Sequence, residues 1–280
     1  MKVIVTGARG LLGRALVPAL EQAGHAVLPL KHADVDITQP EALHHPIRTF
    51  APDWVINLAA YTGVDDCESH PEDARRVNAL GAQQVALAAA AVGASVLQLS
   101  TDYVFDGHGS SPYREDDTPA PASEYGRTKL AGERAVREAN PRHQIVRTSW
   151  LFGPGGSNFV DTMVRKARAG EALRVVDDQR GSPTFTADLS QQLIRLATSG
   201  QFGTYHVTNS GDCTWYDLAA HALSCAGLTV ALARTDSKSF ARPAPRPSYS
   251  VLSNRMAEQV TGVAMPPWQD AVRRHLDAKA

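Results

Sequence analysis

The sequence predicts an α/β fold: a doubly wound parallel sheet followed by a smaller C-terminal lobe. Short apolar strands alternate with helical segments through the first half of the chain. The strands are rich in Val and Ile and nearly continuous in hydrophobicity, which is typical of a parallel sheet covered on both faces. A length of 280 residues suits one large α/β domain with a smaller appendage. We expect residues 1–150 to form the sheet domain and residues 151–280 to form mainly the lobe. The chain can cross between the two parts more than once.

The first half contains five expected strands and four expected helices. The strands are Lys2–Thr6, His25–Leu30, Asp53–Leu58, Ser95–Leu99 and His143–Thr148. The helices are Gly10–Ala23, Pro40–Phe50, Pro71–Val92 and Ser123–Ala139. In the first helix, Leu12, Leu16 and Leu20 share one face. Thr38 is a plausible cap for the second helix, Gly93 stops the third, and a Ser-x-x-Gly start opens the fourth.

The pattern loosens after residue 150. Helices are expected at Ser157–Ala169, Thr186–Thr198 and Thr214–Ala226, and strands at Leu173–Val176 and Gly203–Thr208. The proline-rich segment Ala241–Pro247 is predicted to be an irregular loop. We expect these segments to form a lobe over the carboxyl edge of the sheet, where ligands bind in such folds.

Composition and charge narrow the classes of function. A net charge of −1 argues against a protein that binds the phosphates of nucleic acid. Three scattered cysteines without a C-x-x-C pair indicate free thiols in a reducing compartment and no zinc site. The apolar run Val3–Val5 is too short for a signal peptide, and the Ala-rich stretch from Val85 to Leu97 is interrupted by Gly93. We predict a cytoplasmic protein without a membrane partner.

A glycine-rich turn, Gly7–Gly13, follows the first strand and opens the first helix. Its spacing is G-x-x-G-x-x-G. Glycines here allow a tight turn and a close backbone approach to a pyrophosphate, and the helix N-terminus supplies free N–H groups. Gly7 and Gly10 are therefore predicted to bind a dinucleotide cofactor. The spacing resembles that of the extended short-chain dehydrogenases.

Tyr125 and Lys129 lie four residues apart on one expected helix, so they share a face. A tyrosine has an ordinary pKa of about 10, and a nearby cation lowers it. The pair is therefore predicted to transfer a proton near neutral pH, with Tyr125 as acid. Thr101, with Ser100 as runner-up, ends the fourth strand and is predicted to hold the substrate oxygen.

The chain resembles a narrower family, the dTDP-4-dehydrorhamnose reductases. The likeness is carried in order along nearly the full length. It rests on Asn57–Thr62 with Val64-Asp65, Ser100–Phe105, Tyr125–Glu133, Arg147–Phe152, Asp178–Thr184 and Arg242–Asn254. The combination of S-T-D-Y-V-F with R-T-S-W is specific, whereas the glycine turn and Y-x-x-x-K alone are not.

This resemblance implies a Rossmann-type domain, a nicotinamide cofactor and a dTDP-linked 4-keto-6-deoxy sugar reduced at C4 to give dTDP-L-rhamnose. It implies catalysis by Thr101, Tyr125 and Lys129. Residues implied to bind the cofactor are Gly7, Arg9, Gly10, Leu11, Leu12, Lys31, Asp36, Ile37, Ala59, Ala60, Asn78, Tyr125 and Lys129. Residues implied to bind the sugar are Thr62, Val64, Thr101, Asp102, Tyr103, Trp150 and Asn158. For the substrate diphosphate we predict Arg242 or Arg246, because an arginine fork suits a phosphate.

NADPH is the predicted cofactor, with NADH also accepted. An acidic residue at the end of strand two would favour NAD, but the strand here ends in Leu30-Lys31. Lys31 and Arg9 are predicted to share a 2′-phosphate, while Asp36 and Ile37 lie near the adenine. Some relatives join subunits through magnesium held by acidic groups, one on the first helix. Arg14-Ala15 stands there, so we predict no metal and either a monomer or a homodimer.

Two alternatives stay open. A sugar-nucleotide epimerase or dehydratase of the extended branch would share the fold. A dehydratase needs an acidic pair beside the strand-four threonine, where this chain has Asp102 alone. A non-catalytic regulatory subunit of methionine adenosyltransferase is the second alternative. The presence of Tyr125, Lys129 and Thr101 together argues against it.

Overall fold

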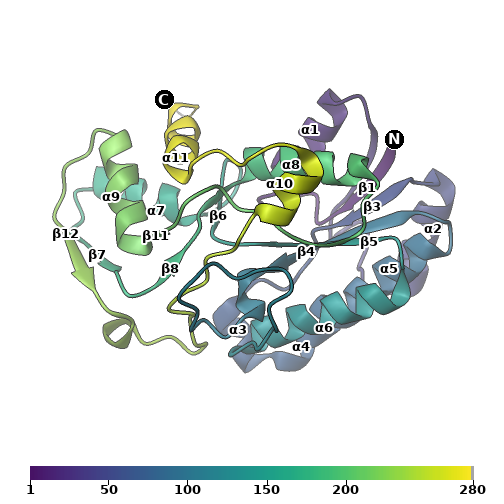
Figure 1. Cartoon of the computed structure of the whole chain (residues 1–280), viewed down its shortest axis with the longest axis horizontal. Helices are drawn as coiled ribbons and strands as arrows, with labels where there is room; N and C mark the ends of the chain where they lie inside the picture. The colour runs from purple at the N-terminus through teal and green to yellow at the C-terminus, as the bar shows by residue number, and fades with distance from the viewer. Residues whose placement is uncertain (279–280) are drawn as a thin grey trace.

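Six parallel strands form the central sheet of the computed structural model, which describes residues 1–278 (Figure 1). Their order is β2-β1-β3-β4-β5-β10. The bounds are β1 Lys2–Thr6, β2 Ala26–Leu30, β3 Trp54–Asn57, β4 Ser95–Thr101, β5 His143–Thr148 and β10 Gly203–His206. The chain reverses its direction of winding between β1 and β3, so the carboxyl ends of these strands border the crevice where such sheets bind ligands. The predicted doubly wound α/β fold is confirmed.

Helices cover both faces of the sheet (Figure 1). One face carries α1 Gly13–Gln22, α8 Thr186–Ser199 and α10 Arg255–Thr261, and the other carries α2 Pro40–Phe50, α5 Ala82–Ala90 and α6 Glu124–Ala139. Successive side chains of a strand point to opposite faces. Val3 and Val5 accordingly pack with α1 and α8, whereas Ile4 packs with α2 and α5. All three side chains are fully buried, which explains the continuous apolar strand.

Another group of elements forms a smaller lobe beside the carboxyl edge of the sheet, at the left of Figure 1. They are β6 Leu151–Phe152, α7 Phe159–Arg168, β7 Leu173–Val176, β8 Arg180–Gly181, β9 Thr184–Phe185, β11 Cys213–Thr214, α9 Trp215–Cys225, β12 Leu232–Thr235 and α11 Trp268–Asp277. Their strands pair in twos: β7 with β12, β8 with β11 and β6 with β9. After residue 150 the chain returns to the main sheet through α8, β10 and α10, so sequence order and spatial grouping differ.

Several expected elements differ in detail. The helix predicted over Pro71–Val92 is split into α4 Pro71–Arg75, a π-helical segment Arg76–Gly81 and α5. Thr38 does not cap α2: Gln39 holds the cap position, and the Thr38 hydroxyl donates to Asp36 at 2.8 Å. The short helix α3 Val64–Ser69, together with α10, α11 and β12, was not predicted. Ala241–Pro247 is irregular, as expected.

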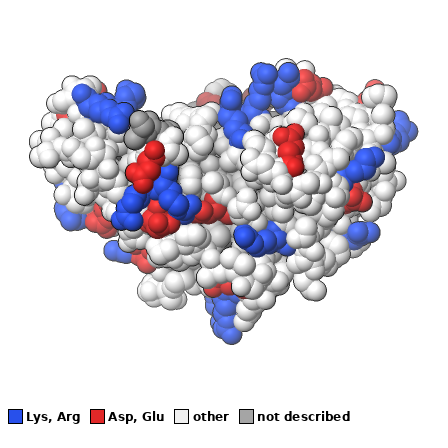
Figure 2. All heavy atoms as spheres, turned by 90° about the horizontal axis from the view of Figure 1, so that it is seen from above, with Lys and Arg blue, Asp and Glu red and all other residues white. Residues whose placement is uncertain are grey.

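Charged side chains of both signs are interspersed over the face shown in Figure 2. This distribution agrees with the small net charge of −1. Within residues 1–278, no helix is both long and apolar enough to cross a membrane.

Candidate active site

The glycine turn after β1 brings two backbones together at the crevice. Gly7 has a φ of +66°, and a Cβ placed on it would lie 2.7 Å from the Ala59 nitrogen. A Cβ on Gly13 would lie 2.6 Å from the Gly7 carbonyl oxygen. Side chains at either position would push the turn away from β3 or distort the start of α1. With glycine at both positions the turn packs closely against β3, and the backbone N–H groups at the N-terminus of α1 stay accessible to a ligand.

A cleft of about 750 Å³ extends from this turn along the carboxyl ends of β1 and β3. Most residues predicted to bind the cofactor line it: Gly7, Arg9, Gly10, Leu11, Leu12, Asp36, Ile37, Ala59 and Ala60. Thr62, predicted for the sugar, and Leu99 of β4 line the same cleft. The volume, the glycine backbone and the polar side chains of the lining fit a dinucleotide.

Lys31 is not brought to the wall of this cleft. Asp34 accepts a hydrogen bond from the Lys31 backbone nitrogen at 3.1 Å and pairs with the ammonium at 3.4 Å. His32 and Arg76 line the cleft instead. Hydrogen bonds from Thr38 hold the pKa of Asp36 below its usual value, and the charge of Arg76 adds to this effect. Sequence reasoning missed both, because His32 sits one residue beyond the expected position and Arg76 comes from the π-helical segment.

Tyr125 lies in the first turn of α6, where the cap is the one expected from the sequence. The Ser123 hydroxyl accepts a hydrogen bond from the Gly126 nitrogen at 3.2 Å. Gly126 lets α6 approach the segment after β4, since a Cβ there would lie 2.1 Å from the Tyr103 carbonyl oxygen. The rings of Tyr103 and Tyr125 consequently meet edge to face, with centroids 5.5 Å apart.

Thr101 is the hydroxyl that joins Tyr125 to Asp102. The Thr101 hydroxyl donates to Asp102 Oδ1 at 2.9 Å and accepts from the Tyr103 nitrogen at 3.2 Å. It also interacts with the Tyr125 phenol and opposes the rise in the pKa of Tyr125 that burial causes. Since a hydroxyl has one proton to donate, Thr101 must turn away from Asp102 to hold a substrate oxygen.

The predicted lowering of the Tyr125 pKa is wrong for this structure. Burial raises the pKa of Tyr125 well above its ordinary value, and the Asp102 carboxylate adds to the rise. Lys129 does not offset this effect, because its Nζ donates to the Leu99 carbonyl at 2.7 Å and is itself buried. Burial lowers the pKa of Lys129 to about 8, and Glu133 opposes that shift. The phenol is therefore protonated at neutral pH, as a proton donor requires.

Asp102 is a buried carboxylate within this cluster, with 2% of its surface exposed. Burial raises the pKa of Asp102 to about 6, against opposing hydrogen bonds from Ser250 and Thr101. Ser250 belongs to the segment that follows the proline-rich loop, so residues about 150 positions apart in the chain meet at this carboxylate. The predicted sugar-binding residue thus lies beside Thr101 and Tyr125.

Asn78 holds the turn after β3 in place. Its Oδ1 accepts from the Tyr61 nitrogen at 2.8 Å, and its Nδ2 donates to the Tyr61 carbonyl at 3.1 Å and to the Thr128 hydroxyl at 3.1 Å. The side chain is 2% exposed and does not line the cleft. Asn78 thereby ties the cleft wall formed by residues 59–62 to the helix that carries Tyr125 and Lys129.

Trp150 adopts a backbone conformation that is rare for a residue with a side chain, with a φ of +48°. Its ring stacks on Trp215 of α9 at a centroid distance of 3.6 Å. Gly181 makes room for the ring, since a Cβ there would lie 2.6 Å from it. Such strain is held only where surrounding contacts determine it, and it is common at ligand sites. The sequence analysis did not find Trp215, because its contact with the site is visible only as stacking on Trp150.

The two predicted diphosphate ligands are both held by Asp65 on α3. Arg246 Nη1 donates to Asp65 Oδ1 at 2.7 Å, and Arg242 Nη1 lies 3.6 Å from Asp65 Oδ2. The side chain of Arg246 is 18% exposed, whereas that of Arg242 is 59% exposed. The charge of Arg246 acts on the Tyr103 phenol and lowers its pKa, in opposition to burial. Arg246 is thus the nearer of the two to the catalytic pair.

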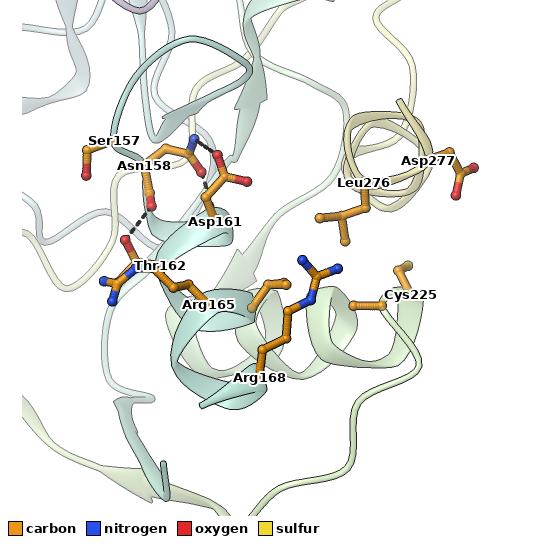
Figure 3. Close-up of a pocket in the computed structure, with 11 residues that line it drawn as sticks. Ser157, Asn158, Asp161, Thr162, Arg165, Arg168, Cys225, Leu276 and Asp277 are labelled. Carbon is orange, nitrogen blue, oxygen red and sulfur yellow. Dashed lines mark hydrogen bonds between the residues drawn. The ribbon is translucent and has the colours of Figure 1, made fainter. Parts of the chain in front are cut away.

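Asn158 is used mainly to cap α7. Its Oδ1 accepts from the Asp161 nitrogen at 2.9 Å, and its Nδ2 donates to the Gly153 carbonyl at 3.0 Å. The residue lines a separate cavity of about 500 Å³ between α7, α9 and α11, into which Arg168 extends toward Leu276 (Figure 3). The structure therefore does not bring Asn158 into the cleft described above.

Comparison with known proteins places these features in a family. The family model described as the RmlD substrate binding domain matches residues 1–280. The spore coat polysaccharide biosynthesis protein SpsK of Bacillus subtilis is 42% identical, covering 100% of this chain and 98% of its own. A dTDP-4-dehydrorhamnose reductase of Streptomyces griseus is 48% identical, covering 89% of this chain and 84% of its own.

A solved structure agrees with these relatives. The dTDP-4-dehydrorhamnose reductase of Bacillus anthracis, in complex with NADP, superposes with a TM-score of 0.96. It is 38% identical and covers 99% of each chain. The resemblance inferred from the motifs is confirmed, and this chain belongs to the RmlD substrate binding domain family of dTDP-4-dehydrorhamnose reductases.

Proposed function

We propose that this protein reduces the C4 keto group of a dTDP-linked 4-keto-6-deoxy sugar, with NADPH preferred as the reductant, to give dTDP-L-rhamnose. The observation that carries the proposal is the protonated, half-buried Tyr125 phenol beside Thr101, on the same helix face as Lys129. The Lys129 ammonium contacts the carbonyl of Leu99, a residue that lines the dinucleotide-sized cleft. The names of the relatives support the substrate, and the NADP complex of one of them supports the cofactor. The free thiols of Cys67, Cys213 and Cys225 fit a cytoplasmic location.

Tyr125, Thr101 and Lys129 have separate roles in the proposed reaction. When bound, the reduced nicotinamide supplies a hydride to the carbonyl carbon. Tyr125 donates its proton to the carbonyl oxygen as negative charge develops there, and it regains a proton from solvent afterwards. Thr101 turns its hydroxyl toward the same oxygen and orients it. Lys129, whose ammonium lies against Leu99 at the cleft edge, binds the nicotinamide ribose and so holds the cofactor in place.

The sugar nucleotide occupies the space between the catalytic pair and the smaller lobe. Thr62 and Val64 face it from the segment after β3, Asp102 and Tyr103 from the segment after β4, and Trp150 from the lobe. Arg246 binds the diphosphate after exchanging its contact with Asp65 for a phosphate oxygen. A charge-assisted, bidentate contact favours this exchange.

The activity is tested by a coupled assay. The protein is incubated with dTDP-4-keto-6-deoxyglucose, a 3,5-epimerase and NADPH, and the absorbance of the reduced nicotinamide is followed. We expect epimerase-dependent loss of absorbance. No loss with either NADPH or NADH would refute the proposal, and tightly bound NAD in the purified protein would favour an epimerase.

We expect kcat/KM to be higher with NADPH than with NADH, through the cationic groups on the cleft wall. Arg9 and Arg76 both line the cleft beside Asp36. A hydrogen bond to a charged group contributes about 1.5–3 kcal/mol, so Arg9→Ala with Arg76→Ala is expected to lower the NADPH/NADH ratio at least about tenfold. Lys31→Ala is the matched control, because Lys31 pairs with Asp34 away from the wall. A wild-type ratio at or below one would contradict the preference.

Arg246→Ala is expected to raise the KM for the sugar nucleotide by about 10–100-fold, as for loss of a charge-assisted hydrogen bond. NADPH affinity should not change, since Arg246 lies outside the cofactor cleft. Arg242→Ala is the comparison variant: its guanidinium is far more exposed and its contact with Asp65 is longer. A KM that stays at the wild-type value in both variants would remove the diphosphate assignment.

A further inference from the structure

Glu133 is a fully buried carboxylate on α6, one helical turn beyond Lys129. The Ser100 hydroxyl donates to its Oε1 at 2.6 Å. Arg147 forms a two-pronged contact, with Nε 2.8 Å from Oε1 and Nη2 2.7 Å from Oε2. Arg137 adds a contact at 3.2 Å from the helix surface. The carboxylate therefore links the catalytic helix to β4 and β5.

The other end of this ion pair is equally enclosed. Arg147 is 1% exposed and lies 5.1 Å from the centre of the Phe105 ring. Its Nη1 is 3.4 Å from His206 Nε2, while His206 Nδ1 lies 3.1 Å from the Tyr113 carbonyl. Nδ1 must carry the proton to donate to that carbonyl, so Nε2 is the acceptor. Burial lowers the pKa of His206 to about 3, and the ring is neutral.

Arg147 thus needs an anion, and Glu133 is the carboxylate that makes an ion pair with it within residues 1–278. A buried ion pair seldom adds to stability, because removing both charges from water costs about as much as their attraction returns. Glu133 accepts a hydrogen bond from Ser100 and lies one helical turn from Lys129, which points to a role in the reaction.

We propose that Glu133 is a positioning residue for the reaction: it anchors β4 through Ser100 and supplies the counter-charge that keeps Lys129 as an ammonium. The inference rests on the proposed function. Residues 125, 129 and 133 are spaced four apart and lie above one another on α6. Glu133 therefore stands on the far side of Lys129 from Tyr125. Thr101 is the next residue of β4 after Ser100. The bond between Ser100 and Glu133 therefore fixes the position of Thr101 relative to α6.

The surroundings make this counter-charge effective. Lys129 is 5% exposed, and charges interact more strongly away from water. Burial lowers the pKa of Lys129 to about 8, and Glu133 raises it. Other ionisable groups also surround this part of α6. They are Tyr125 on α6 itself, Asp102 after β4, Cys67 on α3, Arg147 on β5, His206 on β10, Glu115 beside His206 and Arg147, and Arg137 at the surface.

Glu133→Gln tests the role through the pH dependence of NADPH binding and of kcat/KM. In the wild type, both should fall as pH rises through about 8, the pKa of Lys129. Because a carboxylate favours the protonated ammonium, its removal lowers that pKa and moves the fall to lower pH by about one unit. We expect a loss of about fivefold at pH 8, approaching tenfold at higher pH, and little change at pH 6. NADPH fluorescence titration supplies the binding curve without turnover.

Two further variants keep the result interpretable if Glu133→Gln folds poorly. Glu133→Gln combined with Arg147→Met removes both buried charges, a change that is often tolerated, and it should show the same displaced curve. Arg137→Ala is the control, since it leaves Glu133 and Arg147 in place. An alkaline fall that stays at the wild-type pH in both Glu133 variants overturns the proposal. The binding curve remains informative even if the sugar is not reduced, so failure of the proposed function would be recognised separately.

Discussion

Tyr125→Phe is expected to lower kcat by about 10²–10⁴-fold, the usual contribution of a general acid. Phe retains the ring that packs edge to face on Tyr103 and loses only the hydroxyl. The burial that raises the Tyr125 pKa keeps the proton on the phenol at neutral pH, so Tyr125 is protonated when each turnover of the wild type begins. Without it, the carbonyl oxygen must take its proton from water, for which the buried site has little room.

The measurement is kcat in the coupled assay, together with NADPH affinity by fluorescence titration. NADPH affinity should stay within about threefold of the wild type, because the lost group is one neutral hydrogen bond at most. Tyr205→Phe is the matched control: Tyr205 is a buried tyrosine of β10 whose hydroxyl lies 3.4 Å from the Phe202 carbonyl, away from the cleft. A Tyr125→Phe variant with more than about a tenth of wild-type kcat would contradict the role.

Lys129→Met is expected to weaken NADPH binding by about 10–100-fold and to lower kcat as well. The methionine fills the buried volume but loses the ammonium that binds the ribose and holds the nicotinamide in place. Both effects depend on charge. They should be large at pH 6.5, where the wild-type lysine is protonated, and should shrink above the Lys129 pKa of about 8.

At alkaline pH the NADPH affinities of wild type and Lys129→Met should therefore become similar. A packing defect would instead lower the affinity of the variant equally at every pH. NADPH titrations at pH 6.5 and 9.5 distinguish the two outcomes. Lys166→Met serves as the control, because Lys166 pairs with Glu171 on the surface of the smaller lobe. Equal NADPH affinity of wild type and Lys129→Met at pH 6.5 would exclude Lys129 from cofactor binding.

The sheet, the glycine turn and the spacing of Tyr125 and Lys129 could all be predicted from the sequence. These features are encoded locally. Strands such as Lys2–Thr6 are continuous apolar runs, Gly7 and Gly13 are required by close backbone contacts, and Tyr125 and Lys129 share a face through helical spacing. Short-range periodicity also predicted α1, α2, α6 and α9 nearly to their ends. The same reasoning could not find α3, since six residues are too few to show a helical period.

Tertiary structure alone decided which distant residues meet. Asp65 and Arg246 are 181 positions apart, and Trp150 stacks on Trp215 only because α9 folds back over β6. The return of β10 to the edge of the main sheet likewise leaves no local signal.

Tertiary structure also decided the direction of the catalytic pKa shift. Spacing placed a cation one turn from Tyr125 and thus predicted a lower pKa for the phenol. Burial has the opposite effect on both groups: it raises the pKa of Tyr125 and lowers that of Lys129. Spacing along a helix is a property of the chain, whereas exclusion of water depends on every element that packs against the site.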